Sequence, residues 1–273
     1  MGRIILLVFI SVAVSLALET QAVAQSGDVL VANIVLGDVG DGKYFQSSIQ
    51  LVNLADIPSE ATIHCFSNDG TLTPAFNLDS TVLPPKQVIE LFTSGPGAFR
   101  ECWCRIRPNP GDRIEVSSRI SLYEPSTAVP WPLTSAMTAS VRIPGSPQAP
   151  KWDVPVSLVR VAQCVLDASA LSVVNPSETA AEVDLALDWH RSPNNAVQYG
   201  PVHLTIAPRS RIARSLTALF PEIAPKPELY PLPTRAQEQG VLTVTANLPV
   251  VVSGLEVSSP KIVYSSMLAI PES

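Results

Sequence analysis

The side chains that could do chemistry are few and scattered along the chain. The three histidines are His64, His190 and His203, and they form neither an HExxH motif nor a closely spaced pair. A metal site or a histidine base needs such groups close together, so ordinary surface histidines are favoured. The runs at 94–97 and 253–254 lack the GxSxG frame of a nucleophile elbow. We therefore predict a protein that is not an enzyme, with no catalytic residue, no metal ligand and no cofactor.

Two other patterns have both a chemical and a structural interpretation. The run DVGDG at 38–42 resembles part of a calcium loop. It lacks the alternating oxygen ligands and the distal glutamate of an EF-hand, so a hairpin loop is favoured. Trp131, Trp152 and Trp189 could stack on a sugar ring. Linker tryptophans more often pin a linker to a domain, and we expect that role here.

Arg209, Arg211 and Arg214 form the densest basic cluster. On a strand, Arg209 and Arg211 would share one face and could hold a carboxylate. We expect solvated strand charges instead, because clustered charges most often lie on a solvated face.

The four cysteines predict one structural disulfide. The pair Cys102 and Cys104 encloses a single residue, a spacing that fits neither a zinc knuckle nor the CxxC of a thiol oxidoreductase. In an oxidising compartment, cysteines that lie close in the fold become bridged. Cys164 stands alone in the second half of the chain, and three fates stay open for it. It is free, paired with the remaining first-domain thiol, or used between molecules.

The disulfide partners follow from the alternation of side chains on strands. Cys102 and Cys104 should point inward, because the opposite phase would bury Arg105 and Arg107, and an unpaired buried guanidinium is costly. Residues two apart on one strand cannot readily bond to each other, so Cys65, also inward, joins one of them. We favour Cys104. Cys102 stays the alternative, because the strand register cannot be read from the sequence.

Composition restricts the class of protein. The chain has 273 residues, of which 46% are hydrophobic and 15% charged, enough apolar surface for a packed core. Its 26 prolines argue against a helical bundle. With 18 basic and 24 acidic residues the net charge is −6, so nucleic acid is a poor partner.

The first 24 residues resemble a secretory signal peptide. A basic start at 1–3 precedes an apolar run at 4–18, and Ala22-Val23-Ala24 offers the small residues of a cleavage site. The apolar run is shorter than the roughly 20 residues that span a bilayer. We predict a mature start at Gln25, a secreted or periplasmic location and no membrane span after cleavage.

Short alternating segments separated by turn residues follow, and one of them recurs. Residues 49–66 align without a gap on residues 171–188, and apolar residues keep the same alternate positions in both copies. Such strands without amphipathic helices between them favour a β-sandwich. The predicted fold is all-β, with two tandem immunoglobulin-like β-sandwich domains joined by a proline-rich linker.

Proline density and the repeat set the predicted boundaries. We expect a signal peptide at 1–24, the first domain at 25–124, a linker at 125–154 and the second domain at 155–273. Residues 134–143 are apolar enough to add a strand to one copy, and residues 215–220 could form a helical turn.

The two copies also carry a family resemblance. Residues 47–70 (SSIQLVNLADIPSEATIHCFSNDG) and 169–187 (SALSVVNPSETAAEVDLAL), with the proline-led runs at 82–95 and 206–223, cover both halves of the mature chain. They resemble repeated immunoglobulin-like sandwich modules of uncharacterised secreted bacterial proteins. The resemblance implies a fold and brings no catalytic residue with it. Leu54 departs from the proline common at its position, and the cysteines are particular to this chain.

These observations predict a non-enzymatic β-sandwich protein. It would provide a binding or structural surface for a protein or cell-envelope partner, in adhesion or in envelope or matrix assembly. A periplasmic pilus-type chaperone is the main alternative, although such chaperones hold a client carboxylate with a basic residue on the first strand, and residues 29–36 have none. A hydrolase or a carbohydrate-binding module has less support.

Overall fold

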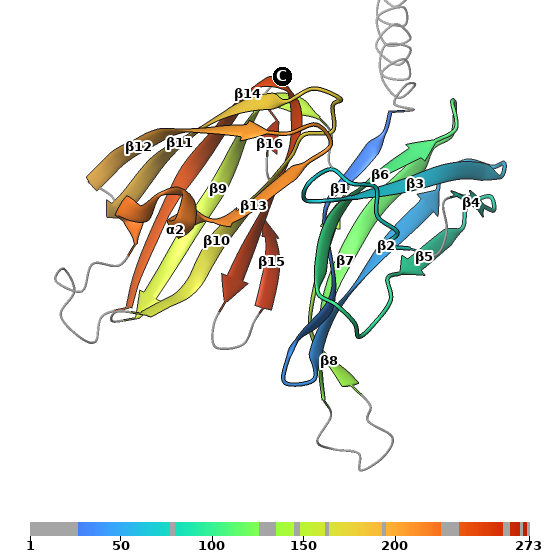
Figure 1. The fold of residues 1–273 in the computed structure, drawn as a ribbon, viewed down its shortest axis with the longest axis horizontal. Coiled ribbons are helices and arrows are strands. Elements are labelled where there is room, and N and C mark those ends of the chain that lie inside the picture. The colour runs from blue at the N-terminus through green and yellow to red at the C-terminus, as the bar shows by residue number, and fades with distance from the viewer. Residues whose placement is uncertain are drawn as a thin grey trace, which may run out of the picture.

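The fold consists of two antiparallel sheets that follow each other along the chain (Figure 1). The computed structural model describes residues 27–76, 80–125, 135–144, 148–161, 164–192, 195–224, 235–258, 263–267 and 270–271. The predicted signal peptide, its cleavage site and Trp131 lie outside these ranges. Most described residues are in strands and the helices are short, so the all-β, two-domain prediction is confirmed.

The first sheet has the spatial order β4-β3-β6-β1-β2-β7-β8, with β5 paired to β2. Its strands are β1 (Val29–Gly40), β2 (Lys43–Asn53), β3 (Ser59–Ser67), β4 (Ser80–Leu83), β5 (Val88–Phe92), β6 (Arg100–Pro108), β7 (Ile114–Pro125) and β8 (Ser135–Pro144). Strand β1 pairs with β6 over residues 29–36 and with β2 over residues 37–40. Strand β1 thus joins the β6 side of the sheet to the β2 side. The sheet curls around its core, and it stays open because β4 and β8, its two edge strands, do not pair with each other.

The second sheet has the order β12-β11-β14-β10-β9-β16, with β13 on β10 and β15 on β14. Its elements are β9 (Ala149–Val161), β10 (Cys164–Val174), β11 (Ala181–Ser192), β12 (Asn195–Ile206), β13 (Arg211–Ser215), the short helices α2 (Leu216–Leu219) and η1 (Pro221–Ile223), β14 (Arg235–Ser258), β15 (Val263–Met267) and β16 (Ile270–Pro271). Strand β9 pairs with β10 and also with β14, and β10 pairs with β14 as well. The pairings therefore return on themselves, and this sheet is nearly closed.

Several predicted segments have the expected local structure. Gly40 pairs with Lys43, and Asp41 and Gly42 between them have φ of 53° and 73°, so residues 38–42 form a tight β-hairpin. Strand β8 covers 135–144, against the predicted 134–143, and extends the first sheet beyond β7. Helix α2 lies within the predicted helical turn at 215–220. The predicted linker at 125–154 thus includes β8 and the first residues of β9.

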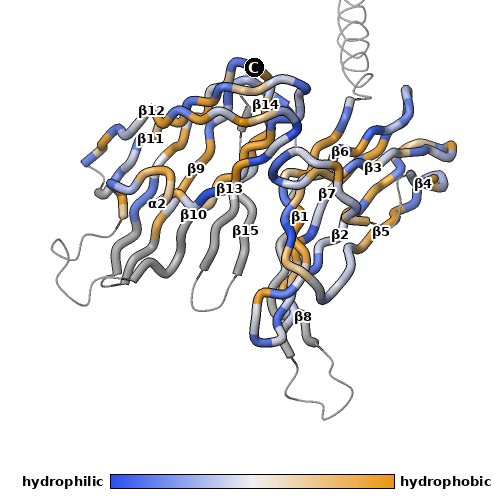
Figure 2. The backbone as a smooth tube through the Cα atoms, viewed as in Figure 1, coloured by the Kyte–Doolittle hydropathy of each residue, from blue (hydrophilic) through white to orange (hydrophobic). Residues whose placement is uncertain are grey.

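Alternation along the repeated segment places the core as predicted. The ten positions assigned inward are all buried, with at most 4% of each residue exposed: Ile49, Leu51, Ala61, Ile63, Cys65, Leu171, Val173, Val183, Leu185 and Leu187. Figure 2 shows apolar stretches along strands of both sheets. Each sheet wraps its own apolar cluster, and burial of this surface is the main favourable contribution to folding.

Each of the two copies also contains a buried asparagine that makes equivalent hydrogen bonds. The side-chain amide of Asn53 donates to the carbonyl oxygens of Ile57, Leu83 and Pro84, at 2.8 to 3.1 Å. Asn175 occupies the aligned position, and its amide donates to the oxygens of Thr179, Ile206 and Ala207 at 2.8 to 3.0 Å. Each asparagine thereby satisfies backbone groups that a buried loop would otherwise leave unpaired.

Earlier in each copy, a serine hydroxyl makes a second pair of equivalent hydrogen bonds. The hydroxyl of Ser47 donates to the backbone oxygen of Val35 and accepts from its amide. Ser169 does the same with Ser157, and both pairs are separated by 12 residues. Neighbouring strands are therefore held by equivalent contacts in the two domains.

Candidate functional site

The two sheets pack against each other through a small apolar cluster. Its members are Leu30, Ala32, Phe66 and Trp103 from the first sheet and Val174 and Val251 from the second. The rings of Phe66 and Trp103 stack with centroids 4.7 Å apart. The indole nitrogen of Trp103 donates to the backbone oxygen of Arg209 at 2.9 Å, so the aromatic pair is tied to the second domain. This contact fixes the geometry of the space between the domains.

The burial of Trp103 corrects the predicted environment of β6. Cys102, Cys104 and Ile106 point into the first core as expected. The opposite face, predicted to be exposed, is also buried at Trp103 because the second domain covers it. The guanidinium of Arg105 lies 5.8 Å from the Trp103 ring and donates to the oxygen of Pro176, which compensates for its partial burial.

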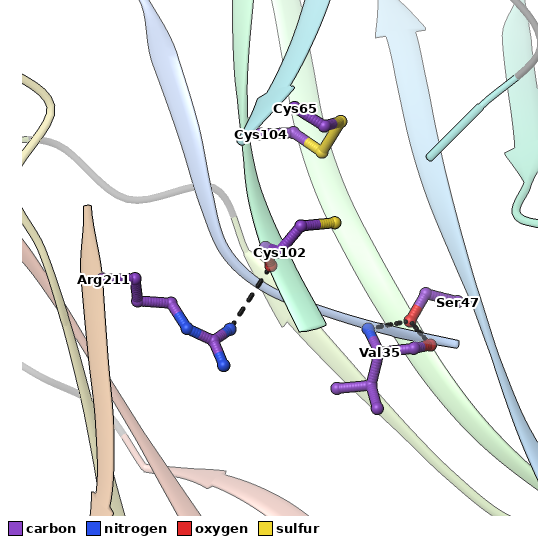
Figure 3. Close-up of a disulfide and its surroundings, with 6 residues drawn as sticks. All are labelled: Val35, Ser47, Cys65, Cys102, Cys104 and Arg211. Atoms are coloured by element: carbon purple, nitrogen blue, oxygen red, sulfur yellow. Dashed lines mark hydrogen bonds between the residues drawn. A yellow bond between two sulfur atoms is a disulfide. The ribbon is translucent and has the colours of Figure 1, made fainter. Parts of the chain in front are cut away.

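Arg211 is the second correction, because its side chain is 1% exposed rather than solvated. Its Nη1 donates to the backbone oxygens of Ala32 and Cys102 and to Oδ1 of Asn33, at 3.0 to 3.3 Å. Its Nη2 lies 3.1 Å from a carboxylate oxygen of Glu101. In Figure 3 the guanidinium of Arg211, on β13, donates to the backbone oxygen of Cys102 on β6. The sequence allowed for an arginine that holds a carboxylate, and here that carboxylate belongs to the other domain.

Two effects act on the pKa of Arg211 in opposite directions. Burial lowers the pKa of its guanidinium, and the neighbouring carboxylate of Glu101 raises it. Its Nε is buried and finds no hydrogen-bond acceptor among the described residues. An unpaired buried donor carries a desolvation cost of about 1 to 3 kcal/mol.

A pocket of about 240 Å³ lies beside Arg211, between the two domains. Its apolar walls come from Val35, Phe45, Phe99, Ile120 and Leu171. The Phe45 and Phe99 rings lie 6.5 Å apart at an interplanar angle of 58°, and Phe99 is 48% exposed. The pocket therefore has an aromatic side that is open to solvent.

The charged residues that line the pocket in the described structure are Glu101, Arg211 and Arg214. Arg214 is exposed, and its side chain makes no hydrogen bond or ion pair with the parts of the chain that the structure describes. The third member of the predicted basic cluster, Arg209, pairs with Glu178 at 3.3 Å on the surface, as expected for a solvated charge. The three arginines thus have three different environments.

The predicted disulfide forms between Cys65 and Cys104, which lie directly opposite each other on β3 and β6 (Figure 3). Cys102, the alternative partner, is a buried free thiol. Burial raises the pKa of this thiol to about 12, although Arg211 acts in the opposite direction. Cys164 lies in β10, and its side chain is outside the described part of the structure.

The other candidate side chains are not brought together. His64, His190 and His203 are exposed on β3, β11 and β12. Trp152 and Trp189 are buried, and their indole nitrogens donate to Val250 and to Glu238, so neither offers a face to a sugar. No group of three or more histidine, cysteine, aspartate and glutamate side chains that could hold a metal ion occurs in the described ranges.

Sequence reasoning missed the pocket residues Phe45, Phe99 and Glu101. Phe45 lies on β2, Phe99 directly precedes β6 and Glu101 lies on β6, and the three share no motif. The fold of the first domain brings them together, and docking of the second domain adds Arg211 and Arg214. The signal that could have found part of the interface is Trp103, a large aromatic residue on the outward phase of a strand.

No family model matches the chain, and no curated protein matches it in sequence. In structure it is similar to Thermotoga maritima 1070, with 16% identity over 45% of this chain and 95% of that chain and a TM-score of 0.30. It is also similar to the tandem CBM22-1–CBM22-2 domain of Paenibacillus barcinonensis Xyn10C, with 8% identity, coverage of 78% and 79%, and a TM-score of 0.21. A third similar structure is an anti-sigma factor domain-containing protein from Clostridium clariflavum, with 9% identity, coverage of 89% and 92%, and a TM-score of 0.21. At these TM-scores the likenesses assign no family.

Proposed function

We propose that this protein is a non-enzymatic binding protein of the periplasm or the extracellular space, built from two immunoglobulin-like sandwiches. It would contribute a surface to adhesion or to envelope or matrix assembly. The observation that carries the proposal is the pocket between the domains, whose lining has apolar walls and contains neither histidine nor cysteine. Its serines therefore have no adjacent imidazole to activate them, which favours binding over catalysis.

The compartment is supported by the disulfide between Cys65 and Cys104. Disulfides form and persist in oxidising compartments and are rare in the cytosol. Within the described residues, no helix is long and apolar enough to cross a membrane.

The alternatives have weaker support. A pilus-type chaperone would need a basic residue on its first strand, and β1 has none over its 12 residues. A carbohydrate-binding module would need exposed aromatic faces, and two of the three candidate tryptophans are buried in the second core.

Affinity capture from the native envelope fraction tests the proposed function. Purified mature protein with intact domains would be the bait, and the same protein after reduction and heat unfolding would be the control for non-specific capture. We expect a defined envelope component to be retained by the folded bait alone. Retention of the same material by both baits, or of none by either, would contradict the proposal.

Intact-mass measurement of protein from the native host tests the compartment. We expect a mature amino terminus at Gln25. A protein that retains residues 1–24 would contradict the proposed location.

A further inference from the structure

The lining of the interdomain pocket combines apolar and charged side chains. Phe45, Phe99 and Ile120 form the apolar side and come from the first domain. Arg211 and Arg214 come from β13 of the second domain and line the same space. A ligand that fills the pocket would therefore contact an aromatic wall and arginine side chains together.

The charges around the pocket leave an excess of donors. Among the described residues Glu101 is the one carboxylate that lines it, and its Oε2 already accepts from Arg211 and from the side chain of Asn68. The Nε of Arg211 is buried without an acceptor in the described structure, and Arg214 has no partner there. The described lining therefore holds two guanidinium groups and one carboxylate, an excess of one positive charge.

We infer that this pocket binds a small carboxylic acid that carries an aromatic or branched apolar group. The apolar group would pack against the Phe45 and Phe99 rings on one side. On the other side it would contact the aliphatic side chains of Val35, Ile120 and Leu171. The carboxylate would accept from the exposed guanidinium of Arg214, because guanidinium N–H groups match carboxylate oxygens in geometry and charge. The inference rests on the proposed binding function and names the ligand class of the pocket.

The size of the pocket limits the ligand. At about 240 Å³ it is smaller than the roughly 300 to 1,000 Å³ typical of sites for drug-sized molecules. One ring with a short acidic chain fits this scale. An affinity of about 1 mM or somewhat tighter is expected for so few atoms.

Isothermal titration of the folded protein with N-acetyl-phenylalanine tests the inference. N-acetyl-phenylalaninamide is the matched probe without charge, and a pentapeptide that ends in phenylalanine is the matched polypeptide source. We expect the free acid to bind at least 10-fold more tightly than the amide. We also expect the pentapeptide to bind more weakly than the free acid, because the pocket has room for a single residue.

Substitutions at exposed positions show where the acid binds. Arg214→Gln removes the free guanidinium, and Phe99→Ala removes the half-exposed ring; each should weaken binding at least 5-fold while the melting temperature stays near that of the wild type. Arg113→Gln, an exposed arginine outside the pocket, is the matched control and should bind as the wild type does.

Three results would overturn the inference. They are equal binding of acid and amide, tighter binding of the peptide than of the free acid, and unchanged affinity in both Arg214→Gln and Phe99→Ala. Absence of binding at 10 mM probe would also overturn it. The envelope capture described above does not use these probes, so the proposed function can survive that outcome.

Discussion

Cys102 is a thiol that the fold keeps protonated. It is 1% exposed and lies two residues from the disulfide partner Cys104, yet no second cysteine is opposite it on the neighbouring strands. Because burial raises its pKa to about 12, almost none of it is thiolate at neutral pH. The thiolate is the reactive form, so Cys102 is protected from exchange with the adjacent disulfide.

The raised pKa predicts a loss of stability at alkaline pH. In the unfolded chain the thiol ionises near pH 9, whereas in the folded protein it stays protonated until about pH 12. Its contribution to stability is therefore complete below about pH 8 and declines as the pH rises from about 9 to 12. At pH 10.5 the loss amounts to roughly 2 kcal/mol.

The Cys102→Ala variant isolates this effect from other titrating groups. At pH 7 it should melt below the wild type, because a buried side chain is truncated. Between pH 7 and pH 10.5 the melting temperature of the wild type should fall by about 4 to 8 °C more than that of the variant. Rapid thermal scans at both pH values measure the difference, and a difference that does not change with pH would contradict the assignment.

At the scale of elements, one turn of the first domain contacts the second. Gly70 has a φ of +85°, and a Cβ built on it would lie 2.5 Å from the backbone oxygen of Pro208. The neighbouring Asn68 accepts, through its backbone oxygen, a hydrogen bond from the amide of Arg211. Only glycine allows both this backbone conformation and this approach.

Gly70→Ala should therefore lower stability through two separable costs. Gly111 is the matched position, because it has a φ of +91° and open space around its Cβ direction. Gly111→Ala should lower the free energy of unfolding by about 1 kcal/mol through backbone strain alone. Gly70→Ala should lower it by about 3 kcal/mol, since the second domain must also move. Equal losses in urea titrations of the two variants would exclude the close contact.

The paired asparagines give a second prediction at this scale. Asn53→Ala and Asn175→Ala each remove three hydrogen bonds to buried or partly buried backbone oxygens. Each variant should lose about 2 to 4 kcal/mol, because the carbonyls are left without donors. Chemical denaturation should show losses within about 1 kcal/mol of each other. A large loss at one position and none at the other would refute the equivalence of the two asparagines.

Much of each sheet could be predicted from the sequence, because alternation reports which side of a strand faces a core. That argument placed Ile49 and Leu171 correctly and selected Cys65 as a disulfide partner. It could not choose between Cys102 and Cys104, because register depends on how two distant strands pair. It also failed for Trp103 and Arg211, since alternation treats each strand as having one buried face and does not report a second domain on the other.

At the scale of the whole molecule, the docking surface around Phe66 and Trp103 of the first domain has no counterpart at the aligned position of the second domain. In the first sheet Phe66 is paired with Trp103 on the face that the second domain covers. The aligned pair in the second sheet is Asp188 and Val241, and both are exposed. The two domains are therefore alike inside and different on their outer faces.

The central claim is that Arg211 and Glu101 couple the two domains and so form the pocket between them. A double-mutant cycle with Arg211→Met and Glu101→Gln, measured by urea unfolding, tests it most directly. The cycle Arg211→Met with Glu60→Gln serves as the control, since Glu60 does not contact Arg211 and those effects should add within about 0.5 kcal/mol. We predict a coupling energy of about 1 to 3 kcal/mol for the Arg211–Glu101 pair. Strict additivity for this pair, as in the control cycle, would contradict the account.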